Sequence, residues 1–96
     1  MQIAISGQHL EVTASLKQHV EEKLEKVIHH FDHLTQAQIV LHIEKEDHMA
    51  EANIHAKGTS IHATGLAENM YAAIDLMAQK LDRQVLKHKE KITNHR

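Results

Sequence analysis

The sequence predicts an α+β fold in which two helices pack on one face of a four-stranded sheet, in the order β-α-β-β-β-α. Four short segments alternate apolar and polar residues, and two longer segments carry a single apolar stripe at helical spacing. Strands with one apolar face and helices with one apolar stripe pack as a two-layer sandwich, which leaves the other sheet face to solvent. The 96 residues contain no proline, repeat or linker, so we expect one domain spanning residues 1–96.

The four predicted strands are short, and each has its apolar side chains on one face. In the second strand, for example, Ile39, Leu41 and Ile43 alternate with Val40, His42 and Glu44. Polar stretches at 46–48 and 57–59 predict hairpin turns between the last three strands. The expected strands are residues 2–6, 37–46, 50–57 and 60–64.

The two predicted helices cover residues 14–31 and 67–91. Thr13 is the expected N-cap of the first helix, because its hydroxyl can accept a hydrogen bond from the first turn. The apolar stripe of the first helix consists of Leu16, Val20, Leu24, Val27, Ile28 and Phe31. The apolar stripe of the second consists of Met70, Ile74, Met77, Leu81, Val85 and Ile92.

The composition argues against several classes of protein. One Phe, one Tyr and no Trp leave almost no aromatic surface for stacking single-stranded bases. No cysteine occurs, which excludes disulfides and Cys-based zinc sites. No nucleophile elbow or phosphate-binding glycine loop is present, so we expect no enzyme activity and no cofactor. The N-terminus lacks a signal peptide and no segment is apolar enough to span a membrane, which indicates a cytoplasmic protein without a membrane partner.

The charge of the chain is distributed unevenly. Residues 70–96 contain six basic and three acidic residues, a net charge of +3, whereas residues 1–69 contain five basic and ten acidic residues, a net charge of −5. The formal charge of −2 for the whole chain therefore conceals a polarised molecule. An asymmetry of this kind suggests a polyanionic partner.

The basic residues of both helices are aligned on one side. At 100° per residue, Lys80, Arg83, Lys87 and Lys91 fall within about 80° of one another beside the apolar arc, and Asp75 lies on its far side together with Asp82. In the first helix, four residues align by the same rule: His19, Lys23, Lys26 and His30. Such a surface suits phosphate groups, because phosphate binding requires rigidly held cations and no base-reading geometry. The alternative is an ordinary solvated helix face.

Eleven histidines suggest two further properties. His42, His55 and His62 are expected on the exposed sheet face, with His55 and His62 as cross-strand neighbours and His42 one strand away. Such surface histidines bind added metal adventitiously, so we expect no physiological metal site; a metal-storage or metal-sensing protein is the alternative. Free histidine has a pKa of about 6.5, so His19, His30 and His88 are expected to gain positive charge as the pH falls from about 7.5 to 6. Affinity for phosphate is therefore expected to rise over this range.

Several segments of the chain resemble the short bacterial ribosome hibernation promoting factors, which belong to the ribosome-associated translation inhibitor and sigma-54 modulation protein family. The second helix carries the most specific similarity, in residues 69–75, 80–85 and 86–89. The opening residues 1–7, the Val40-Leu41-His42 strand and Ile61-His62-Ala63 also match. The resemblance covers essentially the whole chain and implies a fold similar to double-stranded RNA-binding domains.

The resemblance also implies a partner and a set of contacts. Members of this family bind the small ribosomal subunit and its ribosomal RNA, in the channel that holds messenger RNA and the A- and P-site transfer RNAs, and so block translation. The residues that match the family's basic positions, and are thereby expected to contact RNA phosphates, are Lys23, Lys26, Lys80, Arg83, Lys87, Lys89 and Lys91.

The same resemblance implies a role in the stress response of stationary phase. The short members, together with the separate ribosome modulation factor, are associated with inactive paired ribosomes. A related branch with an extended C-terminal tail keeps inactive ribosomes as monomers, and long members add a dimerising domain. A chain ending at Arg96 favours the short type, without tail or dimerisation domain and monomeric off the ribosome. A ribosome-monomer inhibitor and a stand-alone binder of duplex RNA are the alternatives.

Overall fold

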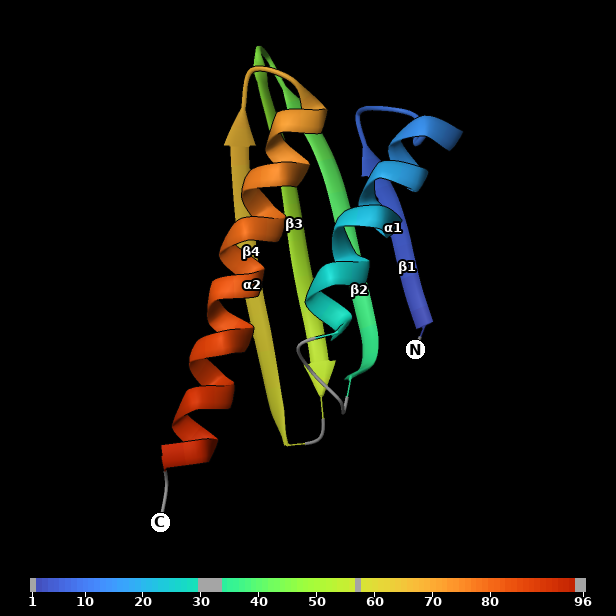
Figure 1. Ribbon diagram of the computed structural model, residues 1–96. Coiled ribbons are helices and arrows are strands. Elements are labelled where there is room, and N and C mark those ends of the chain that lie inside the picture. Colours follow the sequence, from blue (N-terminus) through green and yellow to red (C-terminus); the bar gives the residue numbers. More distant parts are fainter. Residues whose placement is uncertain (1, 30–33, 57, 95–96) are drawn as a thin grey trace.

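The computed structural model confirms the predicted architecture of one four-stranded sheet and two helices (Figure 1). It describes residues 2–29, 34–56 and 58–94, with side chains described as far as Lys87 in the last helix. The order β-α-β-β-β-α is the predicted one. The elements are β1 (Gln2–Gln8), α1 (Ala14–His29), β2 (Leu34–Glu44), β3 (Asp47–Ala56), β4 (Thr59–Ala67) and α2 (Met70–Asn94).

The sheet has the strand order β1-β2-β3-β4, with β1 parallel to β2 and the other two pairs antiparallel. A parallel pair needs a crossover connection, and α1 provides it. Both helices cover the same face of the sheet, α1 over β1 and β2 and α2 over β3 and β4 (Figure 1). In the described residues, no helix covers the opposite face.

The core lies between the helices and this covered face, and its side chains are aliphatic. Alternate strand positions such as Ile39, Leu41 and Ile54 are almost fully buried, because their side chains point toward the helices. They pack against the apolar stripes of both helices, in which Leu24 and Leu81 have no exposed surface. Among the described residues, no polar or charged residue is buried.

The hairpin between β2 and β3 is tighter than predicted. Glu44 pairs with Asp47, so only Lys45 and Glu46 form the turn, and the expected turn at 46–48 is wrong. Lys45 has a φ of 58°, in the left-handed region that two-residue hairpin turns require. Residues 47 and 48 therefore belong to β3, and β2 also begins earlier than predicted, at Leu34.

The hairpin between β3 and β4 also closes over two residues. Ala56 pairs with Thr59, and Gly58 has a φ of 79°, a conformation that glycine adopts without strain. Thr59 was expected in the turn but is the first residue of β4. The strand then continues to Ala67, three residues beyond the predicted end, and includes Gly65.

Side-chain caps determine where both helices begin. The Thr13 hydroxyl accepts a hydrogen bond from the Leu16 amide at 3.2 Å, which confirms the predicted N-cap of α1. In α2, the Asn69 side chain accepts a bond from the Ala72 amide at 2.9 Å. The second helix consequently starts at Met70, and the predicted start at Ala67 is wrong because Asn69 caps the helix. The predicted end of the first helix, at Phe31, lies outside the described residues.

Replacing Asn69 by alanine is expected to lower the free energy of unfolding by about 1 kcal/mol, because the first turn of α2 loses its side-chain acceptor. Urea denaturation followed by circular dichroism measures the change. Asn69→Ser is the matched control, since serine is a comparable N-cap and should restore most of the loss. Equal destabilisation by both variants would contradict a capping role.

No helix in the described part of the chain is both long and apolar enough to cross a membrane.

Candidate nucleic-acid interface

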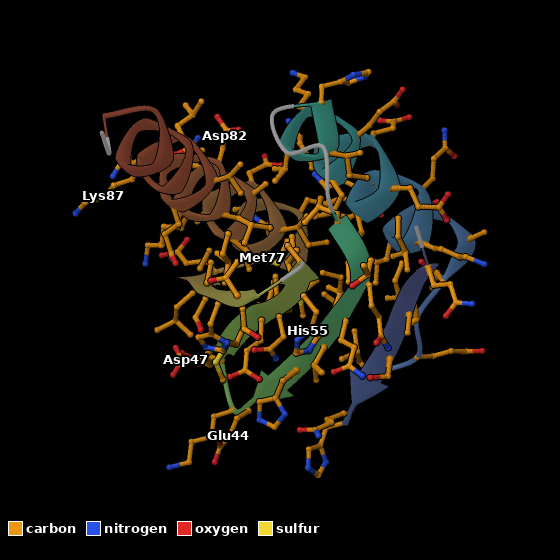
Figure 2. The ribbon with its side chains drawn as sticks, turned by 90° about the horizontal axis from the view of Figure 1, so that it is seen from below. Glu44, Asp47, His55, Met77, Asp82 and Lys87 are labelled. Atoms are coloured by element: carbon orange, nitrogen blue, oxygen red, sulfur yellow. The ribbon has the colours of Figure 1, made fainter. Side chains whose placement is uncertain are left out.

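The described part of the predicted basic stripe of α2 forms one flank of that helix, on the side away from α1. Lys80, Arg83 and Lys87 are all exposed, while Met77 and Leu81 on the core side are fully buried. Figure 2 shows Lys87 on the outer flank of α2, Asp82 on the flank that faces α1, and Met77 pointing toward the sheet. We call Lys80, Arg83 and Lys87 the outer cationic flank; among these described positions there is no acidic residue.

A shallow groove follows the outer cationic flank where α2 passes over the sheet. Its volume is about 300 Å³, and it is lined by Lys80, Arg83, Gln84 and Lys87. The Gln84 amide Nε2 donates a 2.7 Å hydrogen bond to the backbone carbonyl of His62 in β4. This bond ties the flank to the sheet edge. The groove therefore has cations held on a rigid support, which suits phosphate oxygens that accept charge-assisted hydrogen bonds. Sequence reasoning missed Gln84, because neither charge nor periodicity distinguishes it.

The basic residues of α1 face the acidic flank of α2. His19 Nε2 donates a hydrogen bond to Asp75 Oδ1 at 2.7 Å, and Lys23 Nζ lies 3.5 Å from the same oxygen. The His19 ring also meets the Tyr71 ring edge-on, with 5.1 Å between centroids. Helical geometry placed Asp75 on the side of its helix away from the cations, but only the packing of the helices shows that it meets α1. His19 and Lys23 thus serve helix–helix contact, and their contact with RNA stays a prediction.

A second groove, of about 260 Å³, runs between the two helices. Cations and carboxylates both line it, so its charge is mixed. Lys26 is exposed beside it, whereas the side chain of Lys23 is 35% exposed and that of Asp75 41% exposed. The lining residues are Lys23, Lys26, Val27, Asp75, Ala78, Gln79 and Asp82.

The two predicted basic stripes therefore do not form one continuous surface in the described residues. α2 stands between them, with the outer cationic flank on one side and Asp75 and Asp82 on the side toward Lys23 and Lys26. Three further predicted contacts, the side chains of His88, Lys89 and Lys91, lie outside the described residues, as does His30.

The open face of the sheet does carry the predicted histidines, but their pairing differs. His55 pairs with Ser60, and His62 pairs with Asn53, so the expected cross-strand pair of His55 and His62 is wrong. The two-residue turn at Gly58 shifts the register by two residues relative to the expected one.

Each of these imidazoles has a local partner. His55 Nδ1 lies 3.0 Å from Ser60 Oγ, and His62 Nδ1 lies 2.6 Å from Asn53 Oδ1. His42 is opposite Met49 in the β2–β3 pair, with its Nε2 3.5 Å from Glu44. Within the described residues, no group of three or more His, Asp or Glu side chains is arranged to hold a metal ion.

Comparison with known proteins places this chain in a family. Residues 3–93 match the family described as Sigma 54 modulation protein / S30EA ribosomal protein. The chain belongs to this family. The resemblance seen in the sequence is therefore confirmed, and the match covers both helices and all four strands except the first residue of β1 and the last of α2.

Relatives within the family are named ribosome hibernation promoting factors. The chain is 48% identical over 91 residues to the protein of this name from Azotobacter vinelandii, covering 95% of this chain and 85% of that one. It is 41% identical over 95 residues to the Escherichia coli K12 protein of the same name, covering 99% of this chain and all of the other.

Two solved structures have the same fold as this chain. A ribosomal subunit interface protein from Coxiella burnetii superposes with a TM-score of 0.89 at 30% identity, covering 94% of this chain and 99% of that one. The N-terminal domain of Thermus thermophilus Protein Y superposes with a TM-score of 0.85 at 28% identity, covering 92% and 99%.

Proposed function

We propose that this chain is a ribosome hibernation factor that binds the small ribosomal subunit in the messenger and transfer RNA channel and blocks translation in stationary phase. Membership of the hibernation promoting factor family supports the partner. The outer cationic flank supports the mode of binding, because its three cations lie on a rigid helix without an interspersed acid. The role requires no chemical step, and a ribosome-bound factor acts in the cytoplasm.

Inhibition then follows from occupancy of the channel. Lys80, Arg83 and Lys87 hold ribosomal RNA phosphates, and each neutralised phosphate releases counterions, which makes affinity depend steeply on salt. Lys26, on the other side of α2, approaches a different part of the RNA backbone. A protein held in this way excludes messenger and transfer RNA sterically, and we propose that its ribosomes are stored as inactive pairs with ribosome modulation factor acting through the same ribosome.

Competition with the natural occupants of the channel tests this proposal. Small subunits loaded beforehand with messenger RNA and transfer RNA in the P site should bind little of the protein, because the same volume is filled, whereas empty subunits should bind it. Co-sedimentation through a sucrose cushion at physiological salt measures both. Equal binding to loaded and empty subunits would place the protein outside the channel.

Free duplex RNA provides the control for specificity. A stand-alone duplex-RNA binder would bind a short A-form duplex as tightly as the subunit, since it would recognise only helix shape and phosphates. Sucrose-gradient profiles of whole ribosomes, with ribosome modulation factor added, separate the two hibernation outcomes. Paired ribosomes support the proposal, and accumulation of inactive monomers supports the ribosome-monomer inhibitor.

Asp75→Asn is expected to strengthen binding to small subunits. The substitution removes the carboxylate charge 3.5 Å from Lys23 and leaves an amide of the same shape, so that Lys23 becomes available to phosphate. An exposed ion pair is typically worth up to about 1 kcal/mol, which limits the gain to about fivefold in Kd. Glu21→Gln, an equal charge change at an exposed α1 position, is the matched control. Weaker binding by Asp75→Asn would show that Asp75 instead holds the helices in their binding arrangement.

A further inference from the structure

An apolar row crosses the open face of the sheet near the hairpin of β2 and β3. Strand register places His42, Met49 and Leu66 side by side on three neighbouring strands. All three point away from the helices, because the residues before and after them on each strand point toward the helices. Leu66 is 56% exposed, more than Tyr71 at 44%. We call Met49 and Leu66 the apolar row. His42 continues it on β2 but is polar, with a side chain that is 17% exposed and an Nε2 atom 3.5 Å from Glu44.

Acidic residues border the apolar row on both sides. The neighbouring pair toward the hairpin tip is Glu44 and Asp47, which face each other across β2 and β3. The neighbouring row in the other direction contains Glu51, between Val40 and Thr64. Figure 2 shows Glu44 and Asp47 on the side of the sheet away from both helices. The surface thus has one exposed leucine, Leu66, and a half-buried methionine, Met49, between carboxylates.

We propose that the apolar row and its three bordering carboxylates, Glu44, Asp47 and Glu51, bind a segment of a basic protein in which an apolar side chain is flanked by Lys or Arg. The apolar side chain would cover Leu66 and Met49, and the flanking cations would meet the carboxylates. Charge complementarity of this kind selects the partner and its register, and apolar contact supplies most of the affinity.

Two other occupants fit this surface less well. RNA phosphates would meet Glu44, Asp47 and Glu51 and be repelled, because like charges in contact cost free energy. A second copy of the chain would bring the same carboxylates together, because a two-fold interface places identical surfaces against each other. A basic protein segment avoids both conflicts. It could also bind while the outer cationic flank holds RNA, because the open face and the flank belong to different layers of the fold.

A peptide titration tests the proposal without the ribosome. The probe is a synthetic amidated peptide with alternating Lys-Arg pairs and leucines, and its control replaces the leucines with serine. We expect backbone amide shifts in nitrogen–proton NMR spectra to centre on Met49, Glu51 and Leu66 at physiological salt. Leu66→Ser should raise the Kd at least about fivefold, the effect of losing about 1 kcal/mol of apolar contact.

Charge variants separate specific docking from general attraction of a cation to acidic protein. Glu44→Gln with Asp47→Asn should raise the Kd of the leucine peptide at least about fivefold. Glu21→Gln with Glu25→Gln changes the charge equally on the exposed side of α1 and should leave it unchanged. The proposal would be overturned if both pairs of variants weakened binding equally, or if Leu66→Ser had no effect. It would also be overturned if an RNA oligonucleotide produced the shifts instead of the peptide, or if the chain associated with itself through Leu66.

Purified small subunits provide a second measurement, which rests on the proposed function. With Leu66 replaced by p-benzoylphenylalanine, irradiation of the complex should give an adduct with a protein that survives ribonuclease. The docking proposal would be overturned if the adduct contained RNA, or if the variant co-sedimented with the subunit and formed no adduct. Loss of co-sedimentation by the unmodified chain would instead overturn the proposed function, and the peptide titration would then decide the docking proposal alone.

Discussion

Lys80→Glu/Arg83→Glu/Lys87→Glu is expected to abolish co-sedimentation with small ribosomal subunits at physiological salt. The three cations form the outer cationic flank and line one groove, so reversing them places three acids where phosphates are proposed to bind. Their loss should also flatten the plot of log affinity against log salt by about 2 to 3, since each phosphate contact contributes about 0.7 to 0.9. Binding of both proteins measured over a series of salt concentrations below physiological salt gives this slope.

Two single substitutions allow the outer cationic flank to be compared with another helix surface at an equal change of charge. Lys87→Glu and Lys17→Glu reverse one exposed helical lysine each, the first on the outer cationic flank and the second on α1. Only Lys87→Glu should weaken binding, and the fold of both variants should be unchanged because neither side chain is buried. If Lys17→Glu weakens binding as much, then net charge rather than this flank governs affinity.

Gly65→Ala is expected to lower the free energy of unfolding by about 3 kcal/mol, the upper end of the usual cost of overpacking. Gly65 lies in β4 directly beneath α2. A Cβ there would overlap the carbonyl oxygen of Ala73 and lie 2.5 Å from the backbone nitrogen of Met77. Both are helix backbone atoms, so the clash is relieved only by moving α2 away from the sheet. Urea denaturation measures the loss.

Displacement of α2 should also affect binding, because Gln84 ties the outer cationic flank to His62 in β4. Gly65→Ala is therefore expected to weaken subunit binding even under conditions where it remains folded. Gly58→Asn is the control: nothing lies within 4 Å of a Cβ at that position, and asparagine tolerates the positive φ of 79°. Unchanged stability of Gly65→Ala would show that α2 can move away from β4 at little cost.

Sequence periodicity predicted the layers of the fold but misplaced the ends of its elements. Alternation found all four strands, because side chains that face a core must recur every second residue. The predicted positions of both hairpin turns were wrong. At Lys45 and at Gly58 a residue with positive φ allows a two-residue turn that periodicity does not reveal. The error at Gly58 moved the register by two residues and gave His55 and His62 the wrong partners. Gly65 was missed because close approach of β4 and α2 is a tertiary property.

The sequence by itself determined which residues face the core and which cations share a side of each helix, because both follow from the fixed periods of helix and strand. It also carried the family resemblance. Only the tertiary structure decided what lies opposite each side: His19 and Lys23 meet Asp75, whereas Lys80, Arg83 and Lys87 face outward. The reason is that the rotation of each helix about its axis is set by the side chains it packs against, and neighbours distant in sequence leave no local periodic signal.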